Sequence, residues 1–544
     1  MLSGQMMPFP LTFTHVFERA AALFPDSEIV SRAPDRGLRR TTMGAMLRRS
    51  AQLMHALTRL GVRAGDRVAT LCWNHDRHLE IYMGVPTMGA VLHTLNLRLH
   101  PSELAFIARH AGDRIIVADR SLLPLLDRFV REVPCVEHVI VIDDTGAGPV
   151  EGTLDYEALL APEPGEFPLP VLDENAAAIL CYTSGTTGEP KGVVYSHRSN
   201  VLHSLVICMA DMLAVSERDT ALPVVPMFHA NAWGIPFSAV MAGAKIVFPG
   251  PHMDPDSLLD LMAGERVSFA GGVPTIWLGI LARLDAEPQR WDLSAMRSMV
   301  IGGSAAPPSL IDGFRGRHGL IVQHAWGMTE MNPLGTVASL RRSHDGLSDA
   351  DKLHIRASQG RPAPFVETRH TDDTGRILPW DGATQGELEV RGPWVASAYF
   401  GGAGPERFTA DGWFKTGDVV TIDPQGYVRI TDRSKDVIKS GGEWISSVAL
   451  ENALMAHPAV LEAAVFAGRH PKWDERPIAA VVFRPGQSAT PEALREHLAP
   501  SFAAFWLPDA FVAVEQIPRT STGKFLKSRL RELYGELLMD APKS

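Results

Sequence analysis

The stretch YTSGTTGEPKG at residues 182–192 gathers chemical groups that suit phosphate binding. Its glycines expose backbone N–H groups, its Ser and Thr hydroxyls can donate hydrogen bonds, and Lys191 adds a positive charge. A Walker A loop requires a lysine directly after a glycine and directly before Ser or Thr. Here Glu189 and Pro190 separate Gly188 from the lysine, and the stretch is not a GxGxxG dinucleotide motif either. It indicates phosphate binding of another kind, with a flexible surface loop as the alternative.

A second group of candidate residues lies in HAWGMTEM at 324–331, at the end of a strand-like run. Mg²⁺ prefers one or two carboxylates together with phosphate oxygens, so Glu330 beside Thr329 is a candidate metal ligand. Trp326 offers a flat surface on which a base could stack. Taken alone, the same residues could be a Thr–Glu helix cap next to a core tryptophan.

Two further loops each carry one charged candidate. Asp418, in WFKTGDVV (413–420), follows a glycine turn where a carboxylate can bind a ribose diol, although aspartates are common in turns. Lys524, in PRTSTGKFLK (518–527), lies in a polar glycine loop, although most lysines are simply exposed. Lysine is rare here, since only ten of the 52 basic residues are Lys. The joint occurrence of these loops is more informative than any one of them.

The elements that must position these loops alternate between helical and strand patterns over about the first 430 residues. Residues 46–61 have apolar side chains at helical spacing and end at Gly61 as a C-cap. Buried strands are expected at 66–73, 114–119, 138–143, 221–228, 244–250, 297–303 and 320–327. This alternation predicts an α/β fold of layered, largely parallel sheets.

The pattern changes in the last third of the chain. Between about Gly360 and Ile430, turns separate short strands such as 386–392 and 426–432, which predicts a small β-rich unit. After TDRSKD the sequence predicts a compact α+β unit, with a helix capped by Ser446 or Ser447, a strand in RPIAAVVF and a helix in TPEALREHLAP. We therefore predict a large domain over residues 1–432 and a small one over residues 433–544.

Composition bounds the function. A chain of 544 residues is too long for a single hydrophobic core, and 45% hydrophobic with 21% charged residues is ordinary for a soluble protein. A net charge of −10 without long single-sign runs argues against nucleic acid as a partner. The four cysteines form no CxxC motif, and Cys72 and Cys181 are expected to be buried thiols. We expect a cytoplasmic protein with no integral membrane segment.

In combination, these motifs resemble those of the adenylate-forming (ANL) superfamily, which holds the acyl- and aryl-CoA synthetases, firefly luciferase and the adenylation domains of peptide synthetases. The matching stretches, in order along essentially the entire chain, are YTSGTTGEPKG, PMFHANAWG, GGSAAP, HAWGMTE, GELEVRGP, GWFKTGD, DRSKDVIKSGGEWIS and PRTSTGK. The sequence is most similar in pattern to bacterial medium- and long-chain fatty acid–CoA ligases and to 3-methylthiopropionate–CoA ligases.

The resemblance implies a two-step reaction on a small-molecule carboxylic acid. The acid and ATP, with Mg²⁺, give acyl-AMP and pyrophosphate, and CoA then gives acyl-CoA and AMP. A medium- to long-chain fatty acid is the expected substrate, with 3-methylthiopropionate or another short or aryl acid as the alternative. A luciferase-like member is more remote, because nothing in the sequence supplies a luciferin-specific signal. A non-catalytic member is also more remote, because Lys524, Glu330 and Asp418 are all present. Since the sequence ends at Ser544, soon after Lys524, we expect free CoA as acceptor, and we expect a homodimer.

The resemblance also implies roles for individual residues. Lys524, Glu330, Thr183 and His229 are expected to be catalytic, and Thr183 and Glu330 to hold Mg²⁺. The expected ATP- and AMP-binding residues are Thr183, Ser184, Gly185, Thr186, Thr187, Gly188, Lys191, Gly303, Ser304, Ala305, His324, Ala325, Trp326, Gly327, Met328, Thr329, Asp418, Ile430, Arg433, Lys435, Lys439, Trp444 and Lys524. The expected acyl-binding residues are His229, Trp233, Gly302, Gly303, Trp326 and Met328. The expected hinge and CoA-binding residues are Lys435 (the hinge itself), Lys439, Gly441, Gly442 and Trp444. The superfamily commonly has Tyr where this chain has Trp326, and many relatives have Val where it has Ala230.

Overall fold

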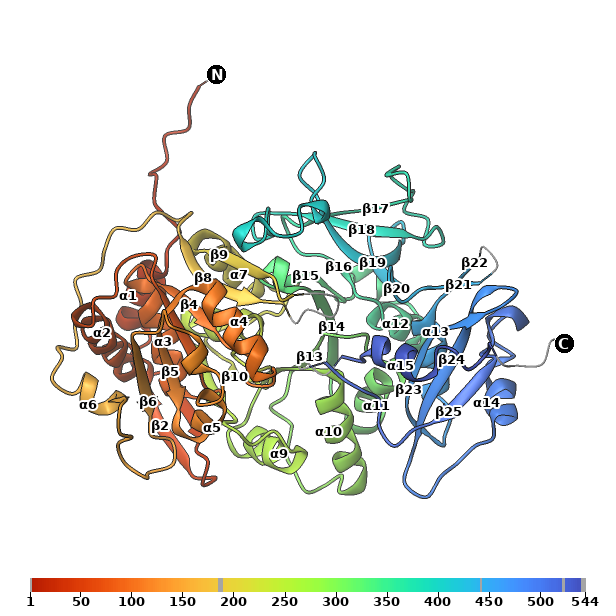
Figure 1. Cartoon of the computed structure of the whole chain (residues 1–544), viewed down its shortest axis with the longest axis horizontal. Helices are drawn as coiled ribbons and strands as arrows, with labels where there is room; N and C mark the ends of the chain where they lie inside the picture. The colour runs from red at the N-terminus through yellow and green to blue at the C-terminus, as the bar shows by residue number, and fades with distance from the viewer. Residues whose placement is uncertain (1, 184–188, 441–442, 521–523, 540–544) are drawn as a thin grey trace.

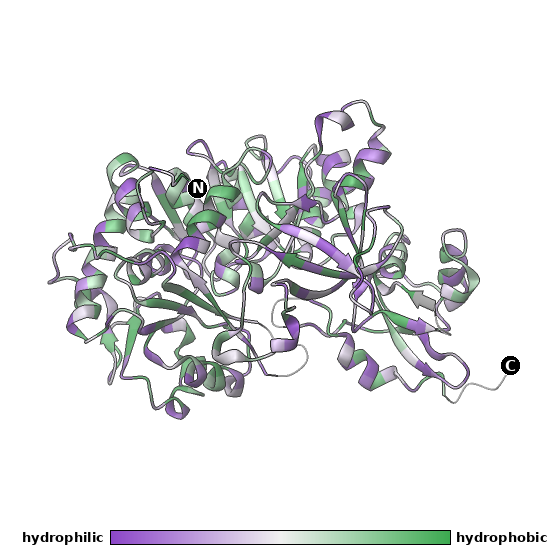
Figure 2. Cartoon of the chain, turned by 90° about the horizontal axis from the view of Figure 1, so that it is seen from above, coloured by the Kyte–Doolittle hydropathy of each residue, from purple (hydrophilic) through white to green (hydrophobic). Residues whose placement is uncertain are grey.

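In a computed structural model, the structure describes residues 2–183, 189–440, 443–520 and 524–539, with the backbone only at 443 and 444. Within these ranges the strands form four sheets (Figure 1). The two larger sheets and their helices make up the part of the molecule built from residues before about 360. Figure 2 shows apolar strands inside this part and mixed polar and apolar colouring along the helices around them.

Among the described residues, the largest sheet has nine strands in the order β16-β15-β14-β13-β12-β10-β11-β1-β2. Their bounds are β1 Glu28–Arg32, β2 Leu38–Thr42, β10 Thr220–Pro223, β11 Lys245–Phe248, β12 Phe269–Gly272, β13 Ser298–Ile301, β14 Val322–Gly327, β15 Leu334–Val337 and β16 Arg361–Pro362. The run from β14 to β1 is parallel, and the outer pairs are antiparallel. The carboxyl ends of β10, β13 and β14 therefore open on the same edge of the sheet.

A seven-stranded sheet in the described part of the chain has the order β7-β6-β5-β3-β4-β8-β9. Its bounds are β3 Arg67–Leu71, β4 Val91–Thr94, β5 Asp113–Asp119, β6 His138–Ile142, β7 Leu154–Asp155, β8 Ala177–Tyr182 and β9 Gly192–Ser196. All its pairs are parallel except β8 with β9, which form an antiparallel hairpin. That hairpin places both ends of the 183–191 loop together.

Helices pack on both faces of the two large sheets. Apolar residues of both sheets and of helices α1, α2, α3 and α8 share one core, while α9, α10 and α11 cover the outer face of the nine-stranded sheet. The helices, as the structure bounds them, are α1 Phe13–Leu23, α2 Met43–Arg59, α3 Asp76–Thr87, α4 Pro101–Ala111, α5 Leu123–Leu126, α6 Tyr156–Leu160, α7 His197–Ile207, α8 Ile235–Ala242, α9 Pro255–Gly264, α10 Pro274–Ala286, α11 Pro308–His318, α12 Asp349–Arg356, α13 Ser447–Met455, α14 Pro491–Leu498 and α15 Lys527–Tyr534. None of the described helices has the length and apolar character needed to span a membrane.

Two smaller sheets follow. The antiparallel sheet β17-β18-β19-β20 has the bounds β17 Glu367–Thr371, β18 Gly386–Arg391, β19 Phe414–Ile422 and β20 Val428–Arg433. The last sheet has the bounds β21 Ile438–Ser440, β22 Glu443–Ile445, β23 Val460–His470, β24 Asp474–Phe483 and β25 Ala510–Ala513. Its two cores contain only residues after Val437, so they are separate from the cores of the larger part. The expected α/β class, with a β-rich unit and a small α+β C-terminal part, is confirmed.

Two expected elements differ from the structure. The strand expected at 221–228 ends at Pro223, because Pro223 and Pro226 lack N–H donors and the Asn74 side chain donates to the carbonyls of Pro223 and Val225, at 3.0 and 2.9 Å. The first predicted helix begins at Met43 instead of Met46, since the Thr42 hydroxyl caps it by accepting the Ala45 N–H at 3.3 Å.

Candidate active site

Asp418 and Trp326 meet where β19 passes the end of β14. The indole N–H of Trp326 donates to Asp418 Oδ2 at 2.9 Å. The Arg433 guanidinium, on the neighbouring strand β20, lies 2.8 Å from Asp418 Oδ1. Gly335 on β15 backs the indole, since a Cβ there would lie only 2.6 Å from the ring. The predicted base-stacking residue Trp326 and the predicted ribose-binding carboxylate Asp418 are thus neighbours, and Gly335 leaves room for the indole.

Lys524 lies in the loop between β25 and α15 and reaches this group from the C-terminal part of the chain. Its loop is closed by hydrogen bonds in which the Thr520 N–H donates to the Lys524 carbonyl at 2.8 Å and the Lys524 N–H donates to the Thr520 hydroxyl at 3.1 Å. Burial, and then the positive charge of Arg433, lowers the pKa of Lys524 to about 8, against the opposing carboxylates of Asp418 and Glu330. A residue more than ninety positions after Asp418 therefore shares its electrostatic environment.

Glu330 is buried and accepts a hydrogen bond at Oε1 from the Tyr399 hydroxyl, at 2.6 Å. Burial, and then the Glu330 charge, raises the pKa of Tyr399, which keeps this phenol a donor. The Lys191 ammonium lies 5.1 Å from the centre of the Tyr399 ring. Tyr399 thus connects the base of the predicted phosphate loop with the predicted metal ligand. Sequence reasoning missed it, and the one available signal was an aromatic residue shortly after GELEVRGP.

Thr183 and Lys191 close the predicted phosphate loop at its two ends. The Thr183 N–H donates to the Lys191 carbonyl at 2.9 Å, and the Lys191 N–H donates to the Thr183 hydroxyl at 3.2 Å. The residues between them for which we expect phosphate contacts, Ser184, Gly185, Thr186, Thr187 and Gly188, lie outside the described residues. The Lys191 end of this loop is near Glu330 through Tyr399, whose ring lies under the Lys191 ammonium and whose hydroxyl donates to Glu330.

The predicted acyl-site residues form a second neighbourhood. His229 is half-buried, and burial followed by the charge of Lys524 lowers its pKa to about 4, so the imidazole is neutral at pH 7. Positions 230–233 have the left-handed φ values 42°, 55°, 49° and 58° in residues that are not glycine. This turn presents the Trp233 indole to the loop after β13, where Cβ atoms on Gly302 and Gly303 would lie 3.3 and 3.7 Å from it.

Other predicted residues occupy the same strand ends. Buried His324 on β14 is 3.3 Å from the Ala357 carbonyl, and burial lowers its pKa to about 4. Ile430 on β20 donates its backbone N–H to the Gln359 side chain at 2.6 Å. The remaining predicted nucleotide residues lie in the loop after β13 or along and just after β14: Ser304, Ala305, Ala325, Gly327, Met328 and Thr329. Gly327 cannot carry a side chain, since a Cβ would lie 1.9 Å from the Pro333 carbonyl oxygen.

The predicted hinge and CoA residues lie at the entry to the last sheet. Lys435 is exposed between β20 and β21. Lys439 is on β21, where its backbone N–H donates to Glu475 at 2.8 Å. The hinge and CoA-binding roles of both lysines stay predictions. Gly441, Gly442 and the side chain of Trp444 lie outside the described residues.

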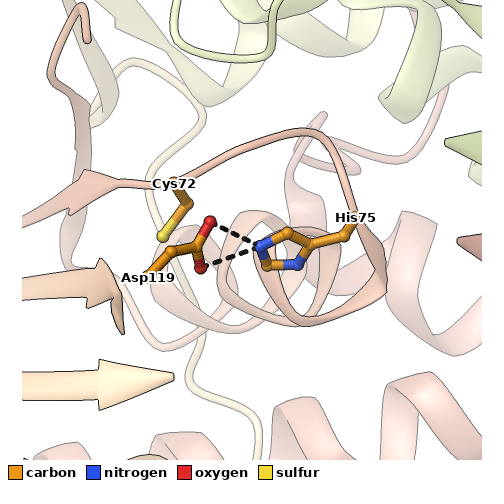
Figure 3. A group of neighbouring side chains, drawn as sticks. All are labelled: Cys72, His75 and Asp119. Atoms are coloured by element: carbon orange, nitrogen blue, oxygen red, sulfur yellow. Dashed lines mark hydrogen bonds and ion pairs between the residues drawn. The ribbon is translucent and has the colours of Figure 1, made fainter. Parts of the chain in front are cut away.

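A buried group of Cys72, His75 and Asp119 also has the residue types of a metal site (Figure 3). Its members already have partners in the protein: His75 Nε2 is 2.9 and 3.0 Å from the two Asp119 oxygens, and the Cys72 thiol is 3.5 Å from the Val117 carbonyl. His75 Nδ1 accepts the His78 N–H and so caps helix α3. We therefore assign this group to the structure of the seven-stranded sheet.

Comparison with known families agrees with this site. The model of the AMP-binding enzyme family matches residues 17–400, and the model described as AMP-binding enzyme C-terminal domain matches residues 449–524. Because the first match alone covers most of the chain, the protein belongs to the AMP-binding enzyme family. The expected membership of the adenylate-forming superfamily is confirmed.

Several named relatives narrow the class within this family. A long-chain-fatty-acid–CoA ligase of Thermus thermophilus is 50% identical over 533 residues, covering 97% of this chain and 96% of that protein. A medium-chain-fatty-acid–CoA ligase of Ectopseudomonas oleovorans is 44% identical, covering 99% of each. A 3-methylmercaptopropionyl-CoA ligase of Ruegeria pomeroyi is 45% identical, covering 98% of this chain and 99% of that protein. Among solved structures, an anthranilate CoA ligase bound to anthranoyl-AMP has a TM-score of 0.86 and 25% identity, covering 98% of this chain and 99% of the other.

Proposed function

We propose that this protein is an ATP-dependent acid–CoA ligase for medium- to long-chain fatty acids. The observation that carries the proposal is the convergence of Lys524 with Asp418, Arg433 and Glu330 from three separate parts of the sequence. The names of the long- and medium-chain relatives, which match over nearly their whole length, supply the substrate class. The solved relative bound to an acyl-adenylate supports the intermediate.

The chemistry proceeds in two displacements. A carboxylate oxygen of the acid attacks the α-phosphorus of ATP, and the bond to pyrophosphate breaks, leaving acyl-AMP. The thiol sulfur of CoA then attacks the acyl carbon, the bond to AMP breaks, and the thiol proton is lost to solvent. A free thiol has a pKa of roughly 8.5, so modest local positive charge raises its thiolate fraction. The protein has to align the reactants and offset charge in both steps.

Named residues would serve the first displacement. Lys524 would bind the carboxylate and α-phosphate oxygens together, since its compact ammonium can follow charge as it moves between them. Asp418 would accept hydrogen bonds from the ribose, and Trp326 would stack on the adenine with the indole face turned away from Gly335. Neutral His229 and Trp233 would border the acid, with the acyl chain passing Gly302 and Gly303.

The donor set around Glu330 fits the Mg²⁺ that such a reaction requires. Among the described residues, the hydrogen bond to this carboxylate comes from Tyr399 to Oε1, which leaves Oε2 without a hydrogen bond from a described residue. One carboxylate with a hydroxyl and phosphate oxygens is a set that Mg²⁺ accepts. When bound, the ion would offset phosphate charge, while Glu330 and Thr183 orient the phosphates.

We further propose that the part after Lys435 rotates between the two displacements, so that Lys524 leaves and the Lys439 face enters with CoA. The separate cores on either side of residues 434–437 support such a rotation. Domains of residues 1–432 and 433–544 follow from the same proposal.

An acid panel tests the substrate class. Purified protein with ATP, Mg²⁺ and CoA is given fatty acids from C3 to C18, 3-methylthiopropionate and benzoate, and AMP and acyl-CoA are measured. Highest kcat/KM between C8 and C16 supports the proposal. A maximum on 3-methylthiopropionate supports the alternative substrate. Each methylene contributes only about 0.8 kcal/mol of binding, so kcat/KM is expected to change gradually with chain length. AMP without acyl-CoA would contradict a CoA ligase.

We also propose a homodimer in the cytoplasm. The segment before α1 extends away from the body in Figure 1, and its apolar side chains Leu2, Met6 and Met7 are 98%, 88% and 86% exposed. Exposed apolar side chains of this kind favour contact with a second copy. The four cysteines are free thiols, which suits a reducing compartment. Light scattering at micromolar concentration tests the dimer, and a monomer mass would contradict it.

A further inference from the structure

The junction between the last two sheets contains a buried carboxylate that the reaction does not use. Strand β20 ends at Arg433 and is held by β19 on the four-stranded sheet, while β21 begins at Ile438 on the five-stranded sheet. Asp432, near the end of β20, has no exposed surface. A buried carboxylate requires strong partners, so its contacts define what this junction holds together.

Asp432 binds the beginning of a helix on the far side of the junction. Its Oδ2 accepts the backbone N–H of Ser447, the first residue of α13, at 2.6 Å. The hydroxyl of Ser446, the N-cap residue of α13, donates to the Thr431 carbonyl. A carboxylate at a helix N-terminus interacts favourably with the unpaired N–H groups and with the helix dipole. The end of β20 therefore caps a helix that belongs to the other sheet.

A lysine on a second helix completes this group. Lys527, the first residue of α15, is 8% exposed, and its ammonium is 2.6 Å from both Glu451 Oε1 and the Ser447 hydroxyl. Its charge also interacts with Asp432. We call Asp432, Ser447, Glu451 and Lys527 the junction cluster. Three members lie after the junction, and Asp432 alone lies before it.

The junction cluster fixes the helix that follows the active-site lysine. Lys524 precedes Lys527, the first residue of α15, by only three residues, so anchoring the start of α15 to α13 and β20 limits where Lys524 can lie. One turn further along α15, Arg531 pairs with Asp436 at 2.9 Å. Asp436 lies after Lys435, so this pair, unlike Asp432 with Ser447, lies entirely on the C-terminal side of the proposed hinge.

We propose that Asp432 is a positioning residue that holds the arrangement with Lys524 in the active site and releases α13 when the C-terminal part rotates. This inference rests on the proposed function, because it requires two arrangements for two half-reactions. Asp432 touches no reacting atom in this role. It acts through the cap on α13 and the charge on Lys527, and it thereby favours acyl-AMP formation over the CoA step.

The test compares both half-reactions in Asp432→Asn. This substitution keeps the shape and an oxygen that can accept the Ser447 N–H, and it removes the charge that faces Lys527. Acyl-AMP formation, measured as ATP–pyrophosphate exchange, is expected to fall about tenfold. That is the scale of losing a charged hydrogen-bond partner. Formation of acyl-CoA from supplied acyl-AMP is expected to stay within twofold or to rise. Asp432→Ala should show the same split more strongly.

Asp436→Asn is the matched control, since it also replaces a carboxylate with an amide. The partner of Asp436, Arg531, lies like Asp436 itself on the C-terminal side of the proposed hinge. This substitution should change both half-reactions equally or change neither. An equal loss of both half-reactions in Asp432→Asn, or no loss of either, would overturn the positioning role. Wild-type protein assayed in parallel separates the two proposals, because absence of any acyl-CoA product there would remove the proposed function itself.

Discussion

At the scale of single residues, the candidate site depends on a few charges held in defined surroundings. Lys524 is half-buried near Arg433, which disfavours its charge, and near Asp418 and Glu330, which favour it. The net lowering of its pKa to about 8 keeps it mostly cationic at pH 7 while making the charge sensitive to alkaline pH. His229 nearby is neutral, so the positive charge around it comes from Lys524 and Arg98.

The pH dependence of acyl-AMP formation follows from this shift. Because the pKa is lowered to about 8, the ammonium is present below that pH and is lost as the pH rises through it. With ATP and acid below saturation, the rate of ATP–pyrophosphate exchange should be half its plateau near pH 8 and fall about tenfold per further pH unit. In Lys524→Arg the remaining activity should lack this decrease. An unchanged decrease in that variant would assign it to another group.

Tyr399 provides a second test. Tyr399→Phe removes the hydroxyl that donates to Glu330 at 2.6 Å and keeps the ring beneath Lys191. A hydrogen bond to a charged group contributes about 1.5–3 kcal/mol, so acyl-AMP formation should fall at least tenfold, with a raised requirement for Mg²⁺. Tyr427→Phe is the control, since its hydroxyl donates to the Ser339 carbonyl at 2.6 Å. Equal effects of both substitutions on the exchange rate would contradict the role of Tyr399.

Sequence reasoning reached some of these residues and not others for a physical reason. Asp418, Glu330 and Lys524 are charged groups that follow closely after glycines in the sequence, where residue type alone indicates chemistry. Tyr399 has no such signal, because its importance depends on a fold that brings the loop after β18 to the end of β14. The pairing of Trp326 with Asp418 is likewise a tertiary contact between strands that no local pattern predicts.

At the scale of elements, loops at strand ends carry the site, and their backbones are unusually constrained. The hairpin of β8 and β9 closes the phosphate loop, and the left-handed turn at 230–233 carries Trp233. Sequence patterns located most strands, because buried parallel strands read as short apolar runs. They extended β10 from Pro223 to Phe228 by mistake, because PVVPMF is apolar although the strand ends at Pro223.

The left-handed turn leads to a stability prediction. A residue with a Cβ in this region costs about 1–2 kcal/mol, and glycine does not. Ala232 in the turn (φ 49°) and Ala239 in helix α8 are both fully buried. Both substitutions should lower the free energy of unfolding, but the loss in Ala239→Gly should exceed the loss in Ala232→Gly by at least about 1 kcal/mol. Glycine relieves the strained turn at position 232, whereas it weakens the helix at position 239. Denaturant unfolding of both variants measures the difference, and equal losses would contradict strain in the turn.

At the scale of the whole molecule, the described part of the chain up to β20 contains three sheets, and the described part after Val437 contains the five-stranded sheet with its own cores. The two parts meet at residues 434–437, and the loop of Lys524 reaches from the smaller part to the site on the larger. Sequence texture located this change of architecture, because the turn-rich β unit and the final α+β unit differ in composition. It could not place the loop of Lys524 beside Asp418, since that placement depends on how the two parts are oriented.

In the proposed mechanism, a single site serves two reactions in turn. The sharpest test assays Lys524→Ala separately in each half-reaction. Acyl-AMP formation from acid and ATP should be lost by at least a hundredfold, because Lys524 is the cation proposed to bind the carboxylate and α-phosphate oxygens together. Acyl-CoA formation from supplied acyl-AMP and CoA should remain close to the wild-type rate. Loss of both half-reactions to the same extent would contradict the exchange of Lys524 for CoA at one site.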